Sequence, residues 1–388
     1  MRLITVLALF VTSICAVSGI AQSVAPDVAA AGRQFVERLS RGEYAALESQ
    51  FTDAMKAALP EDKLAATWTA LTTQAGAFKG VTETRTEARG VLTVAVVACQ
   101  FERAVLDLNV VYNPAGQVGG FSVRPHTAPA PPWSAPDYVT AAAFKETDVT
   151  VGGPEWPLPG TLALPAGTGP FPAVVLVHGS GPNDRDETLG PNKPFKDLAL
   201  GLASRGIAVL RYDKRSKVFG ARLTAIPRFT VKDEVVDDAV AAVALLRRTP
   251  GIDPARIVVL GHSLGGMLVP RIGAADPAIA GLVSMAGAAG ELSATMSRQA
   301  RYIAKADGVV TPDEQKGIDG MDALARQVAA LTPADAASAA PMQGAPASYW
   351  LDLRNYDPVA LARTLGQPLL VLQGERDYQV TMAADFAR

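Results

Sequence analysis

Cysteine, histidine and surplus charge are all scarce in this sequence of 388 residues. It contains two cysteines and three histidines, and its net charge is −2. No block of like charges is strong enough to hold a nucleic acid, and the cluster Lys214, Arg215 and Lys217 is interpreted as a solvated loop. Hydrophobic residues make up 49% and charged residues 19% of the chain, which is typical of a folded globular protein and excludes a disordered one.

The sequence also lacks an apolar run long enough to span a membrane comfortably. Near the N-terminus, Arg2 precedes a mostly apolar run over residues 3–17, and small residues follow up to Ala21. This pattern predicts that residues 1–21 are a signal peptide and that the protein is periplasmic or secreted, with no stable membrane partner. An uncleaved membrane anchor is the alternative. The isoleucine before Cys15 argues against a lipoprotein.

Cleavage after Ala21 would remove Cys15 and leave Cys99 as the one remaining cysteine, so that no intramolecular disulfide could form. The apolar residues Val96, Val97 and Phe101 surround it in the sequence. We therefore predict a buried and unreactive thiol.

The residues after the signal peptide predict a small α+β domain over residues 22–126. Apolar positions recur at helical spacing over residues 28–47 and again near residues 64–71. Strand-like runs follow at residues 91–101, 105–112 and 118–123, with a turn at Asn113–Gly116 between the last two. The Pro/Ala-rich residues 127–137 then predict a semi-rigid linker.

The second domain, residues 138–388, alternates short apolar runs with amphipathic stretches. Predicted strands cover residues 144–151, 158–164, 173–177, 207–210, 257–260, 279–285 and 368–373, and predicted helices cover 197–203 and 231–248. Apolar strands separated by amphipathic helices predict an α/β fold with a mostly parallel sheet covered on both faces. Helical, Ala-rich sequence at about residues 291–352 interrupts the alternation and predicts a cap over a pocket.

The pattern Gly-His-Ser-Leu-Gly at residues 261–265 lies between a predicted strand and a predicted helix. A serine on such a tight turn has strained backbone angles and an exposed hydroxyl, which is the arrangement of a nucleophile. The residues two positions before and after Ser263 must be small, and Gly261 and Gly265 meet this need. The sequence therefore indicates Ser263 as a nucleophile.

These residues, with His178–Gly181 after an earlier strand, resemble the α/β-hydrolase superfamily from about Lys145 to the end of the chain. The resemblance implies an oxyanion hole made by the backbone N–H groups of Ser180 and Leu264. The runs at 178–186 and 211–215 resemble a bacterial esterase-like or serine aminopeptidase-like subgroup. The N-terminal residues resemble a small α+β domain of unknown function that often precedes such hydrolases.

The acid of the expected triad should follow the strand at residues 369–373, and Asp377 has that position. Glu375 is the first alternative, and Asp352 and Asp357 fit less well because they precede the strand. The carboxylates Asp184, Asp186 and Glu187 raise the question of a metal site. Without a supporting histidine, salt bridges with Arg185 are the favoured interpretation, so no metal or cofactor is predicted.

The expected triad lacks its histidine, because no histidine follows Asp377. His126 lies at the edge of the linker, His178 is interpreted as a brace of the oxyanion loop, and His262 is turned away by the elbow. A natural pseudoenzyme is one explanation. The favoured one is that the sequence stops before the final strand, helix and histidine loop of the fold, so that the chain as given would be inactive.

We therefore expect an exported serine hydrolase that cleaves carboxylic esters through an acyl-enzyme on Ser263. Its substrate would be a small ester or a short acyl or peptide compound. Two alternatives stay open at this point: an aminopeptidase or acylaminopeptidase that applies the same groups to amides, and a non-catalytic protein that binds a ligand under the cap.

Overall fold

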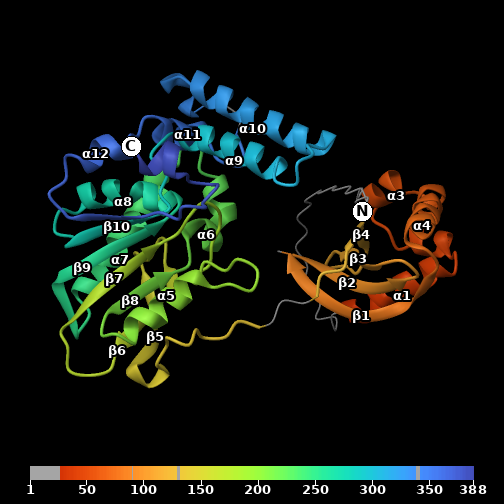
Figure 1. The fold of residues 1–388 in the computed structure, drawn as a ribbon, viewed down its shortest axis with the longest axis horizontal. Helices are drawn as coiled ribbons and strands as arrows, with labels where there is room; N and C mark the ends of the chain where they lie inside the picture. Colours follow the sequence, from red (N-terminus) through yellow and green to blue (C-terminus); the bar gives the residue numbers. More distant parts are fainter. Residues whose placement is uncertain (1–26, 90, 129–131, 338–340) are drawn as a thin grey trace. The chain divides into compact units, whose positions relative to one another are not determined.

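The computed structural model describes residues 27–89, 91–128, 132–337 and 341–388, so the predicted signal peptide and Cys15 lie outside the described residues. The chain divides into two compact units between residues 129 and 130, inside the predicted linker (Figure 1). No helix among the described residues is long and apolar enough to cross a membrane. Each unit is described below by itself.

The first unit contains a helical layer. Its helices are α1 (Val28–Ser40), α2 (Tyr44–Glu48), α3 (Asp53–Ala58) and α4 (Glu61–Ala75). Helix α1 begins at Asp27, whose carboxylate accepts hydrogen bonds from the N–H groups of Ala29 and Ala30 at 3.1 Å each. Its Phe35 and Leu39 lie one turn apart on one face and are buried, as the helical spacing predicts.

The second layer of this unit is an antiparallel sheet in the order β1-β2-β3-β4. Its strands are β1 (Phe78–Arg89), β2 (Leu92–Phe101), β3 (Val105–Tyr112) and β4 (Val118–Pro125). The predicted turn before β4 is confirmed, since the side chain of Asn113 accepts the N–H groups of Ala115 and Gln117. Strand β1 was not predicted, because its residues 82–88 (TETRTEA) carry almost no large apolar side chain.

The helices cover one face of the sheet, and alternate residues of β2 pack against them. Ala95, Val97 and Cys99 are fully buried in the same core as Phe35 and Trp68. Burial, helped by the charge of Asp107, raises the pKa of the Cys99 thiol to about 12. The predicted burial of Cys99 is therefore confirmed, and its raised pKa disfavours the reactive thiolate form.

The second unit has a seven-stranded sheet in the order β11-β10-β9-β7-β8-β6-β5. Its strands are β5 (Phe144–Val151), β6 (Leu158–Pro165), β7 (Phe171–Val177), β8 (Ala208–Tyr212), β9 (Ile252–His262), β10 (Gly281–Met285) and β11 (Leu369–Leu372). Strands β5 and β6 are antiparallel to their neighbours, whereas β8, β7, β9, β10 and β11 run parallel. The predicted α/β fold with a mostly parallel sheet is confirmed.

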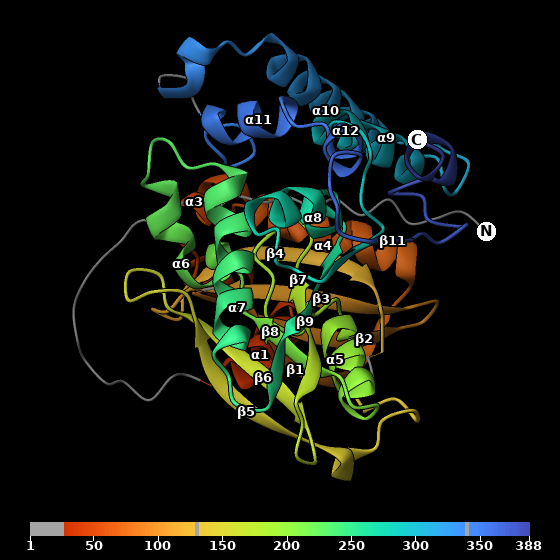
Figure 2. The same ribbon diagram turned by 90° about the vertical axis from the view of Figure 1, so that its left-hand side faces the viewer.

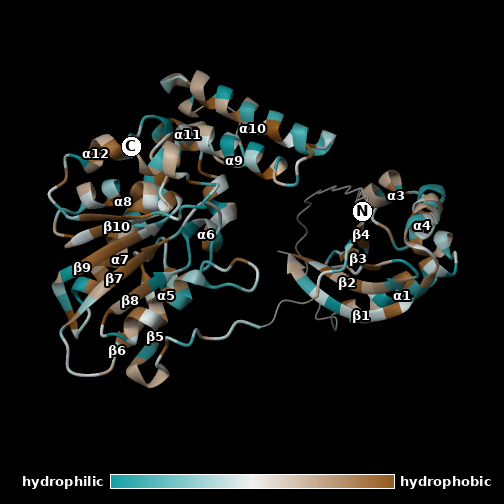
Figure 3. Cartoon of the chain, in the orientation of Figure 1, coloured by the Kyte–Doolittle hydropathy of each residue, from teal (hydrophilic) through white to brown (hydrophobic). Residues whose placement is uncertain are grey.

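Alternate residues of the central strands face opposite sides of this sheet, as the twofold period of a strand requires. Val175 and Val259 face the core that contains α7 (Asp237–Arg247) and α8 (Leu264–Ala275). Leu176 and Leu260 face the core that contains α5 (Pro194–Ala203). Figure 2 shows these helices around the sheet, and Figure 3 shows the hydrophobic colour of the central strands.

The segment between β10 and β11 contains the helices α9 (Leu292–Ala304), α10 (Pro312–Ala330) and α11 (Ala347–Arg354). They gather at one end of the unit, beyond α8 (Figure 1). Helix α10 begins with a capping box, in which Thr311 and Glu314 satisfy each other's backbone N–H groups. The remaining elements of this unit are η1 (Ala141–Ala143), α6 (Arg215–Thr224), η2 (Lys232–Val236), η3 (Pro333–Ala337), α12 (Pro358–Ala362) and η4 (Met382–Phe386).

Candidate active site

The turn between β9 and α8 places Ser263 in a strained conformation. Its backbone angles are φ 52° and ψ −113°, in a region that residues with a side chain rarely adopt. Two hydrogen bonds hold the turn: Ser263 N–H donates to the carbonyl of Met285 at 2.9 Å, and the carbonyl of Ser263 accepts from Met267 N–H at 2.8 Å. The serine is half-buried at the start of a helix.

The glycines around Ser263 are required by close backbone contacts. A Cβ atom on Gly261 would lie 2.2 Å from the carbonyl oxygen of Gly265, and a Cβ on Gly265 would lie 2.3 Å from that of Val177. A Cβ on Gly266 would lie 2.9 Å from the carbonyl oxygen of Met285. The strand and the helix therefore pack backbone against backbone, and any side chain here would force them apart.

Backbone donors without an acceptor among the described residues lie at this turn. Among them are the N–H of Leu264, in the first turn of α8, and the N–H of Ser180, in the loop after β7. The loop touches the turn, since a Cβ on Gly179 would lie 3.2 Å from Cβ of Ser263. Both residues that the resemblance assigns to an oxyanion hole thus have free N–H groups, one directly after Ser263 in the chain and the other directly after Gly179, which contacts Ser263.

Glu187 joins the loop to the turn. Its carboxylate is buried, and its Oε1 atom accepts a hydrogen bond from Gly179 N–H at 2.8 Å. The same Oε1 atom lies 2.9 Å from Nδ1 of His262. Glu187 itself has a φ of 51°, so the loop bends sharply to return this side chain toward Gly179. Sequence reasoning treated Glu187 as a salt-bridge partner of Arg185, which is wrong.

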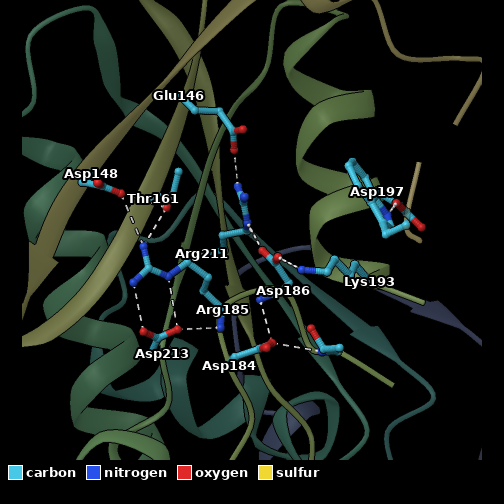
Figure 4. Close-up of polar contacts among 12 residues, drawn as sticks. Glu146, Asp148, Thr161, Asp184, Arg185, Asp186, Lys193, Asp197, Arg211 and Asp213 are labelled. Atoms are coloured by element: carbon cyan, nitrogen blue, oxygen red, sulfur yellow. Dashed lines mark hydrogen bonds and ion pairs between the residues drawn. The ribbon is translucent and has the colours of Figure 1, made fainter. Parts of the chain in front are cut away.

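Arg185 pairs instead with a carboxylate that follows the neighbouring strand β8. Its guanidinium donates to both carboxylate oxygens of Asp213, at 3.1 and 2.9 Å, and to the hydroxyl of Thr161 at 2.8 Å (Figure 4). The backbone N–H of Arg185 donates to Asp213 as well, at 2.8 Å. Because both ends of this residue bind one carboxylate, the loop after β7 is fixed to the loop after β8.

A second cluster in Figure 4 fixes the same loop through Asp186. Arg211, which is buried on β8, donates to Asp186 at 2.8 Å and to Glu146 at 2.7 Å, while Lys193 donates to Asp186 at 3.0 Å. Burial opposes the charge on Asp186, but these two cations outweigh it and lower the pKa of Asp186. Asp184 accepts backbone N–H groups of its own loop. The three carboxylates therefore organise the loop by different contacts.

The loop after β11 holds Asp377 through several donors. Its Oδ1 atom accepts the N–H groups of Gln379 and Val380 at 2.8 and 3.1 Å, and its Oδ2 atom accepts from the side chain of Gln373 at 3.2 Å. The three donors fix the carboxylate at the start of its loop.

Strand register brings Asp377 to the same edge of the sheet as Ser263. Met285, the last residue of β10, pairs with His262 at the end of β9 and with Leu372 at the end of β11. The chain leaves these three parallel strands at one edge, which is where the carboxyl ends of a parallel sheet form binding sites. The charge of Asp377 is close enough to contribute to the pKa of His262.

The alternative acids have other partners. Asp352 forms an ion pair with Arg271 at 2.6 Å, and Asp357 accepts the first N–H groups of α12 as its N-cap. Glu375 is exposed in the same loop as Asp377. The geometry therefore favours Asp377 among the four candidates.

The three histidines lie in different settings. His126 is 2.7 Å from Asp107 in the first unit. His178 is fully buried against the ring of Tyr212, and burial lowers its pKa to about 4. Burial also opposes the charge of His262, but Glu187 and, more weakly, Asp377 outweigh it and raise the pKa of His262. His262 is thus directed to Glu187.

Sequence reasoning missed Lys214, which it placed in a solvated loop. The structure corrects this: Lys214 is 2% exposed, at the end of β8, whereas Lys217 is exposed. The signal was available, because Lys214 comes two residues after a strand that pairs in parallel with β7. Loops at the same ends of paired parallel strands lie side by side, so a residue here meets the loop after β7.

Two protein families match the two units of the chain separately. Residues 174–388 match the family described as alpha/beta hydrolase family, and residues 32–121 match a family described as protein of unknown function (DUF3887). The chain is 38% identical over 347 residues to esterase EstD of Thermotoga maritima, an alignment that covers 89% of this chain and 79% of EstD.

Solved structures with a similar fold include an esterase of Pyrococcus furiosus and an acylaminoacyl peptidase. The first is 17% identical with a TM-score of 0.42, and the match covers 67% of this chain and 82% of that chain. The second is 14% identical with a TM-score of 0.41, and the match covers 79% of this chain and 48% of that chain.

The contacts of Gly261 predict a large loss of stability in Gly261→Ala. The new methyl group would lie 2.2 Å from a backbone oxygen that cannot move without shifting α8. We expect the free energy of unfolding, measured by urea titration, to fall by about 3 kcal/mol or more. Gly320→Ala in α10, where a Cβ meets nothing within 4 Å, is the control and should gain up to about 1 kcal/mol. Equal effects of the two substitutions would contradict this prediction.

The buried His178 predicts a loss of stability in acid. Its pKa is about 4 in the folded protein and near 6.5 in the unfolded chain, so its contribution is complete above pH 6.5 and falls as the pH decreases toward 4. The loss amounts to roughly 3 kcal/mol below pH 4. Urea titrations between pH 7 and pH 4 should show a shallower pH dependence in His178→Phe than in the wild type. Parallel curves would show that His178 does not carry this effect.

Proposed function

The chain belongs to the α/β-hydrolase family, and on this premise we propose that it is a serine hydrolase that cleaves carboxylic esters through an acyl-enzyme on Ser263. Its identity to esterase EstD supports an esterase acting on a small molecule. The observation that carries the proposal is the strained turn at Ser263 beside the free N–H groups of Leu264 and Ser180. Strain at one residue is maintained only where the surrounding structure enforces it, and such residues cluster at functional sites.

In the proposed reaction, Oγ of Ser263 attacks the ester carbonyl carbon and transfers its proton to a general base. The carbonyl oxygen becomes an oxyanion, which accepts hydrogen bonds from the N–H groups of Leu264 and Ser180. Collapse of the tetrahedral intermediate releases the alcohol, which takes up the proton, and leaves the acyl group on Ser263. Water then attacks the acyl group by the same steps, releases the carboxylic acid and restores the serine.

The proposal gives Asp377 the role of orienting the base. Its Oδ1 and Oδ2 atoms are fixed by neighbouring donors at the edge of the sheet where Ser263 lies. The base of such a triad is a histidine, and this role is not assigned to the three in the sequence. His178 is buried with its pKa near 4, His262 is directed to Glu187, and His126 binds Asp107.

The nucleophile is tested with a fluorophosphonate probe on the full-length protein. The wild type should become labelled and Ser263→Ala should not, while Ser204→Ala, at the end of α5, should label like the wild type. Hydrolysis of p-nitrophenyl acetate should fall by at least 10³-fold in Ser263→Ala, as expected for loss of a nucleophile. Labelling of Ser263→Ala at the wild-type level would refute the nucleophile. Activity confined to aminoacyl-p-nitroanilides would favour an amide hydrolase instead.

We further propose that the protein is exported, since Arg2 and the apolar residues 3–17 have the composition of a signal peptide. Expressed in a bacterium, the protein should be recovered outside the cytoplasm with Gln22 as its first residue, as read by mass spectrometry. Leu9→Arg should block export by breaking the apolar run, whereas Leu9→Ile should not. Recovery of the uncleaved wild-type chain in the cytoplasm would contradict the proposal.

A further inference from the structure

Lys214 carries a buried charge directly behind the loop that bears Ser180. Its side chain is 3% exposed, and its ammonium group donates a hydrogen bond to the carbonyl oxygen of Gly179 at 2.9 Å. This carbonyl belongs to the peptide group that also contains the N–H of Ser180. No role for this lysine in the reaction follows from the serine, the acid or the two backbone donors.

We infer that Lys214 is a positioning residue of the oxyanion hole, which aims the N–H of Ser180 by holding the carbonyl of Gly179. The two groups belong to one planar peptide unit, and the bond between these residues is trans. In a trans peptide the C=O and the N–H point in opposite directions. A cation that holds the oxygen on one side therefore fixes the N–H on the other side, where the oxyanion would form.

Other contacts fix the same stretch of backbone, so that the peptide has one orientation. The side chain of Asn183 donates to the carbonyls of Gly179 and Ser180 at 3.2 and 3.1 Å. On the other side of Gly179, its N–H donates to Glu187 at 2.8 Å. Lys214 differs from these partners because it is the cation among them. An ammonium group that donates to the carbonyl oxygen polarises the peptide and makes its N–H a stronger donor.

Among the described residues, the carboxylate of Glu234 is the ion-pair partner of the buried Lys214. Oε1 of Glu234 lies 3.6 Å from the ammonium nitrogen, and Oε2 accepts a hydrogen bond from the hydroxyl of Tyr349 at 2.7 Å. Burial opposes the charge of Glu234, but Lys214, Ser216 and Tyr349 outweigh it and lower its pKa, so Glu234 stays ionised. The shorter contact of Lys214 is thus with the carbonyl and not with its counter-ion.

The inference rests on the proposed function, because it assumes that Ser180 N–H binds the oxyanion formed by attack of Ser263. Its test is steady-state hydrolysis of p-nitrophenyl acetate by the full-length protein and by Lys214→Met, which keeps an unbranched side chain as far as Cε and removes the ammonium donor. We expect kcat to fall by about 10- to 100-fold and KM to change by less than about twofold, since the oxyanion exists only after attack. Lys217→Met, at the exposed neighbouring lysine, is the control and should keep the wild-type kcat.

A second variant separates positioning from ion pairing. Lys214→Met alone leaves Glu234 buried without its cation and can destabilise the fold, whereas Lys214→Met with Glu234→Gln removes both charges and keeps an acceptor for Tyr349. If the lysine aims the peptide, the double variant should regain the wild-type melting temperature while its kcat stays low. Recovery of the wild-type kcat in the double variant would overturn the inference.

A trifluoromethyl ketone gives a readout that does not depend on turnover. Its adduct with the serine carries an oxyanion, so its inhibition constant should weaken by the same factor as kcat/KM in the double variant. An unchanged inhibition constant would overturn the inference. Ser263→Ala separates failure of the proposed function from failure of the positioning role. Full activity in Ser263→Ala refutes the proposed function, whereas activity that needs Ser263 but not Lys214 refutes the positioning role alone.

Discussion

The packing of strand β9 against helix α8 at Ser263 is the constraint on which the candidate site depends. Gly261 and Gly265 bring the two backbones into contact, and Ser263 adopts a positive φ where the chain passes from one element to the other. The strain is tolerated because both elements are anchored in a large apolar core. Ser263 thereby lies at the carboxyl edge of the sheet, where β9 ends and α8 begins.

The loop after β7 reaches the same edge, and beyond the buried His178 its position depends mainly on charged side chains. Gly179 contacts Ser263 and has no side chain of its own to hold it, so neighbouring residues bind its backbone. Glu187 binds its N–H and Lys214 binds its carbonyl, while Arg185 ties the loop to Asp213 beyond β8. Buried charges are costly unless paired, and a network in which each has a partner restricts the loop to one conformation.

Sequence reasoning succeeded where one residue pattern has one structural outcome. The apolar runs of β7, β9 and β10 and the Gly-x-Ser-x-Gly turn were predicted, because a buried parallel strand needs continuous apolar residues and the turn needs glycine. Strand β1 was missed because its side chains are mostly polar. The partners predicted for Arg185 and the solvated position predicted for Lys214 were wrong. A charged residue in a loop is expected to be solvated until the position of the neighbouring loop is known.

The donors in the proposed oxyanion hole are backbone groups, which only a substitution by proline can delete. Other substitutions act on them through the side chains that orient their peptide groups, and orientation is what preorganised catalysis requires. A donor that turns away by a few tens of degrees loses most of its hydrogen bond, although it is still present in the sequence. This is why a lysine that never touches the substrate can control the reaction: it acts on the carbonyl at the opposite end of the donor's own peptide.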